Sequence, residues 1–312
     1  MEVGRIRPFE SVRSNPAGIL GAVVRGVAGA VALSFLYVVI CHYCPIIYLN
    51  ILFAVGYGFL VGALCRAGIK AGRVNSVKGA VIAGLSVGAI MAWMAWVAYL
   101  WMYLDYNFRE YLYFLVNPSE VLSGISVVGH HPLWSLSRSG APPAVFYYVV
   151  WILEALLLAG CAVRVPVRFV RENKLCPDCG KWMTSTGEQA FFGAGDWDAV
   201  GQELAEGRIG ALLALPRTEP AGIPEAKWLD AGAFACPECD DGGCYVTVAS
   251  VAVLPAKKKG EVQRKVRVMA RFVEVGNDDA DALFHPVSAE PEADGAGAMP
   301  EEETAHAAAE QE

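Results

Sequence analysis

Two short cysteine motifs in the second half of the chain have the residue types and the spacing of a metal site. They read Cys176-Pro-Asp-Cys179 and Cys236-Pro-Glu-Cys239. Two cysteines separated by two residues can point both thiolates at one ion, and two such knuckles supply the four sulfur ligands of a tetrahedral Zn²⁺ site. The sequence therefore predicts zinc as a cofactor, with these four cysteines as its ligands. The alternative is two unrelated pairs of reduced thiols.

The two motifs resemble the knuckles of the zinc-ribbon or rubredoxin-like class of small metal modules. The resemblance covers the knuckles and the strands near them, and it implies a small module held together by one metal ion. The 56 residues between Cys179 and Cys236 exceed the usual spacing of about 15–20 residues. An insertion is therefore predicted to leave the module and return to it. Cys244 is predicted to be a spare thiol, with the alternative that it replaces Cys239 as the fourth ligand.

The first half of the chain is too apolar for a soluble domain. Of all 312 residues, 55% are hydrophobic and only 18% are charged, whereas soluble domains are about 45–50% apolar and about 25% charged. A membrane helix needs roughly 20 mostly apolar residues. Four such stretches are predicted as spans, at residues 21–40, 46–65, 79–101 and 144–163. The predicted fold class is an α-helical membrane bundle of four transmembrane helices with a small α+β zinc-ribbon-like domain.

The basic residues between the spans predict how the chain crosses the membrane. Arginine and lysine gather before the first span, in the loop 66–78 and after the fourth span, whereas the turn 41–45 and the loop 102–143 carry few. Segments rich in arginine and lysine stay on the cytoplasmic side. The prediction is a multi-pass protein of the cell membrane, taken to be a bacterial inner membrane, with both termini in the cytoplasm.

These boundaries divide the chain into four predicted parts. A basic cytoplasmic N-terminus (1–20) precedes the four-helix transmembrane domain (21–164), and a cytoplasmic zinc-ribbon-like domain with an insertion follows (165–285). The tail (286–312) has eight acidic and no basic residues. Such a composition predicts disorder.

A third cysteine pair, Cys41 and Cys44, lies in the predicted turn on the far side of the membrane. Two cysteines at this spacing beside a histidine can form a redox-active pair. Four helices with such a turn resemble the membrane disulfide-generating quinone reductases, but those enzymes need a second cysteine pair, and the segment 102–143 contains none. The alternatives are a structural disulfide or two buried thiols, and a metal site that adds three histidines: His42, His130 and His131.

Glu154 is an acidic residue deep within the fourth predicted span. A charged carboxylate near the bilayer centre costs at least about 2.5 kcal/mol, so Glu154 is predicted to face the interior of the bundle, protonated or paired. The candidate partners are Ser34, Asn50, Ser86 and the tyrosine hydroxyls. The functional interpretation is a proton or ion site, and the alternative is a structural hydrogen bond that fixes helix register.

Glycines spaced four positions apart predict close packing between spans. Two such pairs are Gly58/Gly62 and Gly84/Gly88. This spacing lets two helix backbones approach closely. The pairs are interpreted as packing within the bundle, with homodimerisation as the alternative.

The sequence after the second knuckle predicts a β-hairpin with one buried face. Residues 245–253 and 266–275 are rich in β-branched side chains and alternate in polarity over much of their length. The lysine run 257–259 between them is interpreted as a solvated turn, with contact to anionic lipid as the alternative. A helical segment is predicted within 196–215. Five aromatic side chains are predicted to form a small core around the metal: Trp182, Phe191, Phe192, Trp197 and Trp228.

The favoured function is non-enzymatic: a membrane protein with a structural zinc site that acts as a scaffold or recruits a partner. No phosphate-binding loop or catalytic constellation stands in the part after the spans, and His285 and His306 have no evident partner. The lipid bilayer and either a protein partner or a second copy are the expected partners. Nucleic acid is not predicted, because the folded part is not basic enough. The alternatives are a thiol-redox protein using Cys41 and Cys44, and a small transporter using Glu154.

Overall fold

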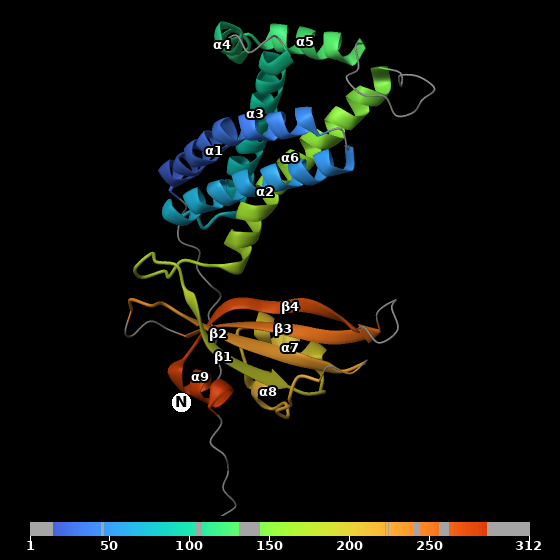
Figure 1. The fold of residues 1–312 in the computed structure, drawn as a ribbon. Coiled ribbons are helices and arrows are strands. Elements are labelled where there is room, and N and C mark those ends of the chain that lie inside the picture. The colour runs from blue at the N-terminus through green and yellow to red at the C-terminus, as the bar shows by residue number, and fades with distance from the viewer. Residues whose placement is uncertain are drawn as a thin grey trace, which may run out of the picture.

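Four long apolar helices form a bundle, as the sequence predicts (Figure 1). The computed structural model describes residues 15–285 except 45–46, 104–107, 131–143, 222, 224, 240–243 and 256–261. The four helices are α1 (Pro16–Tyr43), α2 (Ile47–Ala71), α3 (Val77–Tyr103) and α6 (Ala144–Glu172). Each is long and apolar enough to cross a membrane. All four extend past a predicted boundary, because helical backbone continues beyond the apolar core of a span. The predicted tail lies outside the described residues.

The glycine pairs of α2 and α3 lie at helix–helix contacts inside the bundle. Helix α6 packs on both α2 and α3. A Cβ added at Gly58 of α2 would lie 2.8 Å from the Cβ of Cys161, and one added at Gly88 of α3 would lie 2.9 Å from the Cα of Ala159. Both contact residues belong to α6. The close approach that these glycines permit therefore serves packing within one chain.

The two helices of the first hairpin touch backbone to backbone near one end of the bundle. A Cβ at Gly68 of α2 would lie 2.4 Å from the Cα of Ala22 in α1, and one at Gly18 would lie 2.2 Å from the carbonyl oxygen of Gly72. The start of α1 thus meets the end of α2. The end of α6 lies there too, since the Arg66 guanidinium stands 4.9 Å above the Phe169 ring. The basic loops therefore gather at one end of the bundle.

The segment between α3 and α6 contains two helices where the sequence analysis predicted a loop. Helix α4 (Phe108–Val116) and helix α5 (Pro118–His130) meet at an angle of 111°. Both pack on α3, and Tyr111, Phe114 and Val121 are buried in the cluster that they share with it. The pair covers the end of the bundle opposite the sheet (Figure 1).

The part after the spans, residues 173–285, is called the α+β region. Its sheet has the order β1-β2-β3-β4, and all neighbours are antiparallel. The strands are β1 (Thr184–Phe192), β2 (Lys227–Ala235), β3 (Cys244–Pro255) and β4 (Val262–Val275). Strands β3 and β4 confirm the predicted hairpin.

Three short helices complete the α+β region and cover a second hydrophobic core. Helices α7 (Trp197–Ala205) and α8 (Gly210–Leu213) confirm the helical segment predicted between the knuckles, and α9 (Asn277–Phe284) follows β4. Their buried side chains Leu204, Leu212 and Leu283 pack with Phe192 and Leu229 of the sheet.

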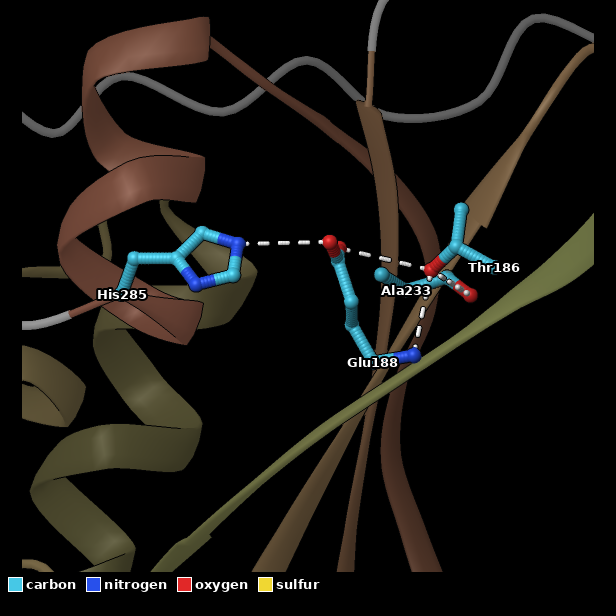
Figure 2. A network of polar contacts seen from close by, with 4 residues as sticks. All are labelled: Thr186, Glu188, Ala233 and His285. Atoms are coloured by element: carbon cyan, nitrogen blue, oxygen red, sulfur yellow. Dashed lines mark hydrogen bonds and ion pairs between the residues drawn. The ribbon is translucent and has the colours of Figure 1, made fainter.

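A polar network ties the end of the described chain to β1 (Figure 2). The His285 Nε2 lies 3.3 Å from the Glu188 Oε1, which corrects the expectation that His285 lacks a partner. The Thr186 hydroxyl bridges Glu188 and the carbonyl oxygen of Ala233 at 3.4 and 3.5 Å. His285 and Glu188 are both exposed, so their contact adds little stability.

Candidate metal centre and intramembrane polar contact

The four predicted ligand cysteines meet in one cluster. The sulfur atoms of Cys176, Cys179, Cys236 and Cys239 all lie within 4.8 Å of one another. The Cys179–Cys236 distance is 3.3 Å and the Cys176–Cys239 distance is 3.9 Å. A tetrahedron with Zn–S bonds of about 2.3 Å has sulfur–sulfur edges of about 3.8 Å, so the spacing fits a four-thiolate ion.

The first knuckle lies immediately after α6 and is shaped by backbone hydrogen bonds. The Cys176 N–H donates to the Lys181 carbonyl at 2.7 Å, and the Gly180 N–H donates to the Cys176 carbonyl at 3.0 Å. Gly180 has a φ of +68°, a conformation that glycine adopts without steric cost. The turn therefore brings both thiols of the motif to the same side.

The second knuckle lies at the end of β2 and before β3. Cys236 directly follows Ala235, the last residue of β2. The Lys181 Nζ of the first knuckle lies 2.6 Å from the Glu238 Oε1 of the second. Because both side chains are partly exposed, this ion pair contributes at most about 1 kcal/mol. The sheet, and the cysteines themselves, must hold the knuckles together.

The hydrogen bonds within the cluster favour a thiolate at Cys236. Burial by itself raises the pKa of this thiol, but the backbone N–H of Glu238 and the thiols of Cys179 and Cys239 lower it to about 7. In the same network, hydrogen bonds with Cys179 and Cys236 raise the pKa of Cys239. The thiolate is the form that binds a metal.

The core around the cysteines differs from the predicted one. It consists of Met183, Tyr245 and Phe272, with Phe234 packed beside it; the rings of Phe234 and Phe272 are 4.9 Å apart. None of the five predicted aromatics belongs to it. Phe192 and Trp197 lie in the core under the short helices, Phe191 and Trp228 lie in a third cluster, and Trp182 packs against the helix bundle.

Alternation along the extended chain explains why Trp182 is not part of that core. Successive side chains of an extended segment point to opposite faces. Met183 faces the cysteines, and its neighbour Trp182 therefore faces the bundle. This alternation just after the first knuckle was the signal in the sequence that could have separated the two residues.

Two side chains of the α+β region cap the ends of membrane helices. The Trp182 Nε1 donates to the Lys70 carbonyl at the end of α2, and an Arg271 guanidinium nitrogen donates to the Arg171 carbonyl at the end of α6, both at 2.8 Å. The last four carbonyls of a helix have no partner within it. The positive charge of Arg271 also suits the negative end of the helix dipole.

Each capping residue adjoins a residue of the cysteine-cluster core. Trp182 precedes Met183, and Arg271 precedes Phe272, both buried with the cysteines. Phe272 has a φ of +50° at irregular pairing between β3 and β4. Such a bulge re-aims side chains. The cysteine cluster and the contacts to the bundle are thus parts of one packed unit.

Cys41 lies in the last turn of α1, and Cys44 is the C-cap residue of that helix. Over the described residues, the cluster of Cys176, Cys179, Cys236 and Cys239 is the one group of three or more potential ligands. Cys41, His42, Cys44 and His130 therefore form no such group. His131, the remaining residue of that hypothesis, lies outside the described residues.

Glu154 is hydrogen-bonded across the centre of the bundle. The Tyr37 hydroxyl of α1 donates to its carboxylate. Helices α1 and α6 each pack on α2 and α3, so this bond joins two opposite members of the bundle. The prediction of a tyrosine partner is confirmed. Two of the other named candidates bond elsewhere: the Ser34 hydroxyl donates to the Val31 carbonyl, and the Asn50 side chain donates to the Cys44 carbonyl.

We expect Tyr37→Phe to destabilise the bundle by about 1–3 kcal/mol, because the Glu154 carboxyl then loses its buried donor. Equilibrium unfolding of the full chain with SDS measures the change. The double variant Tyr37→Phe with Glu154→Leu should recover most of the loss, because both polar partners are then absent. An unchanged unfolding midpoint for Tyr37→Phe would show that the bond contributes nothing.

The four-cysteine cluster beside an antiparallel sheet agrees with the resemblance noted in the sequence, as far as ligand set and neighbouring strands go. In the part of the chain that the structure describes, the cysteine cluster lies near one end of the bundle of membrane helices. Comparison of the chain with protein-family models, with curated proteins and with solved structures gave no match, so the chain is assigned to no family.

Proposed function

We propose that this multi-pass membrane protein is a non-enzymatic scaffold in which a structural Zn²⁺, bound by Cys176, Cys179, Cys236 and Cys239, fixes the α+β region on the membrane bundle. The observation that carries the proposal is the meeting of four thiols from two knuckles that are 56 residues apart in sequence. An ion bound by all four thiolates would crosslink the two knuckles.

The residues around the cluster connect this crosslink to the helix bundle. Met183 and Phe272 pack with the cysteines, and their neighbours Trp182 and Arg271 donate to helix ends of the bundle. A metal-held cluster would therefore set the position of the sheet against α2 and α6. A sheet held in this way suits the recruitment of a protein partner to the membrane.

The scaffold is proposed to lie on the cytoplasmic side of a bacterial inner membrane. The basic loops gather at the end of the bundle that carries the α+β region, and segments rich in arginine and lysine stay in the cytoplasm. Reduced thiols of the cytoplasm are available to bind a metal, whereas an oxidising compartment would favour disulfides.

Two other functions are less well supported by the same structure. A redox role of Cys41 and Cys44 needs a relay cysteine pair, and the segment 102–143 has no cysteine. A transport role of Glu154 competes with its hydrogen bond to Tyr37, which gives the carboxyl group a structural role between α1 and α6. A scaffold requires neither a relay cysteine pair nor an ionisable site at Glu154.

Two successive experiments on the full-length protein, metal analysis and then crosslinking, test the proposal. The purified chain should contain about one equivalent of zinc, and less than about half an equivalent would refute the site. Crosslinking in native membranes should then capture a partner with the wild type and with Cys244→Ser, but not with Cys176→Ser. Equal capture by all three proteins would contradict a metal-dependent scaffold.

The contact between Trp182 and Lys70 can be tested by itself. Trp182→Phe keeps a ring near Phe169, which now lies 4.9 Å away, but removes the N–H donor. One such bond contributes about 1 kcal/mol, so amide exchange in residues 174–183 should rise about fivefold. The control is Trp197→Phe, which removes a bond to the Gly193 carbonyl away from the bundle. The same response to both changes would exclude a specific contact.

A further inference from the structure

The first half of β4 is an exposed, positively charged sheet edge. Strand β4 pairs with β3 on one side only, because it is the last strand of the sheet. Its first six residues, 262–267, are all exposed, and they include Arg264, Lys265 and Arg267. Val266 among them is 59% exposed. An unpaired edge of this kind is open to contact with another surface.

The β3–β4 hairpin carries a net positive charge. Strand β3 contains no charged residue, and β4 contains four arginines and lysines but only one acidic residue, Glu274. Glu274 lies at the far end of the strand, next to the cysteine cluster. The sequence between the strands adds the lysine run 257–259 and one further acidic residue, Glu261. The exposed edge therefore suits an anionic surface.

The position of β4 places this edge close to the membrane. Arg271 of β4 is hydrogen-bonded to Arg171, the second-last residue of α6. In Figure 1, β4 is the strand nearest the helices, and it runs across beneath them. The strand thus leaves the end of α6 and extends sideways under the bundle.

The distance between Arg171 and the lipid headgroups follows from the length of α6 beyond its apolar run. Arg171 lies eight residues beyond Val163, where the apolar run of α6 ends, which is about 12 Å along a helix. The headgroup layer takes up roughly 5–8 Å of this distance. The remainder is within the length of an arginine side chain and within a Debye length of about 8 Å at physiological salt.

We propose that residues 262–267 of β4 lie against the anionic lipid headgroups of the leaflet next to the α+β region. Arginine and lysine near such a surface are attracted to it, and the exposed valines of the same segment can approach the interface. The proposal does not depend on zinc. A second explanation of the charges, protection of a free edge against strand pairing, requires no lipid contact and predicts a different result.

Hydrogen exchange of the full-length chain in nanodiscs separates these explanations. Peptides covering 262–268 should exchange about fivefold more slowly when about one third of the phosphatidylcholine is replaced by phosphatidylglycerol. High salt should abolish the difference. Neutralising the edge with Arg264→Gln, Lys265→Gln and Arg267→Gln should abolish it too, whereas Arg208→Gln, which neutralises an exposed arginine before α8, should not.

Three results would overturn the proposal. Equal exchange in neutral and anionic discs would mean that the edge contacts no lipid charge. Protection in both kinds of disc, with two chains per disc, would mean that the edge pairs with a second copy. A lipid effect that persists in the triple variant would place the contact elsewhere. Hydrogen exchange of peptides from β2, which should be the same in the triple variant and in the wild type, checks that the variant is folded.

Discussion

Cys236→Ser is expected to abolish binding of the proposed zinc by the full-length chain and to open the α+β region to proteolysis, while the helix bundle stays intact. A serine hydroxyl does not supply the thiolate ligand that Zn²⁺ requires. Metal binding by structural zinc sites is worth about 10–16 kcal/mol in small peptides at neutral pH, which is as large as the stability of a whole domain. Zinc analysis and limited proteolysis of the purified protein measure both effects.

Cys244→Ser is the matched control, because Cys244 lies at the start of β3 outside the cluster. It should keep both the metal and the resistance to protease. If Cys236→Ser retains a full equivalent of zinc, the cluster is not the binding site. If zinc is lost but the protease pattern does not change, the metal has no structural role.

Gly68→Leu should disrupt the packing of α1 on α2 and lower the stability of the bundle by about 3 kcal/mol or more. A Cβ at this position would already lie 2.4 Å from the Cα of Ala22. Backbone cannot give way as a flexible side chain does, so the two helices must separate. Equilibrium unfolding of the full chain with SDS provides the measurement.

Gly56→Leu provides the comparison on the same helix, since a Cβ at Gly56 meets nothing within 4 Å. Both changes replace glycine by the same good helix former, so the gain in helix propensity, at most about 0.8–1.0 kcal/mol, is the same in both variants. The difference between them therefore reports packing alone. Equal unfolding midpoints for the two variants would show that α1 and α2 do not approach as closely as described.

The parts of this fold that depend on residue type and local spacing could be predicted from the sequence. The four helices follow from apolar length, because a bilayer demands about 20 apolar residues per crossing. The four-cysteine cluster follows from ligand chemistry, which pairs Cys176-Pro-Asp-Cys179 with Cys236-Pro-Glu-Cys239 even across a long insertion. The partner of Glu154 could be narrowed to Ser34, Asn50, Ser86 or a tyrosine hydroxyl, since a buried carboxyl needs a hydrogen bond.

The parts of the fold that depend on how separate elements meet could not be predicted from the sequence. Nothing in the spacing of Trp182 or Arg271 indicates that each donates to the end of a membrane helix. The core around the cysteines was wrongly predicted because aromatic residues were chosen by size, whereas strand direction and the bulge at Phe272 decide which side chains face the cluster. Helices α4 and α5 lie in a segment whose apolar residues fit either a loop on the membrane or a packed cap.

The short connection between α6 and the first knuckle has a mechanical consequence. Only Asn173, Lys174 and Leu175 separate the end of the helix from Cys176, and three residues span at most about 10 Å. Any tilt or axial rotation of α6, such as a thicker bilayer imposes on a membrane helix, must therefore pull on Cys176 and Cys179. Cys236 and Cys239 follow β2 and are linked to α6 less directly, through the sheet and the Arg271 contact, so the two knuckles feel unequal forces. We therefore expect the thickness of the membrane to change how readily a chelator withdraws the metal from the cluster.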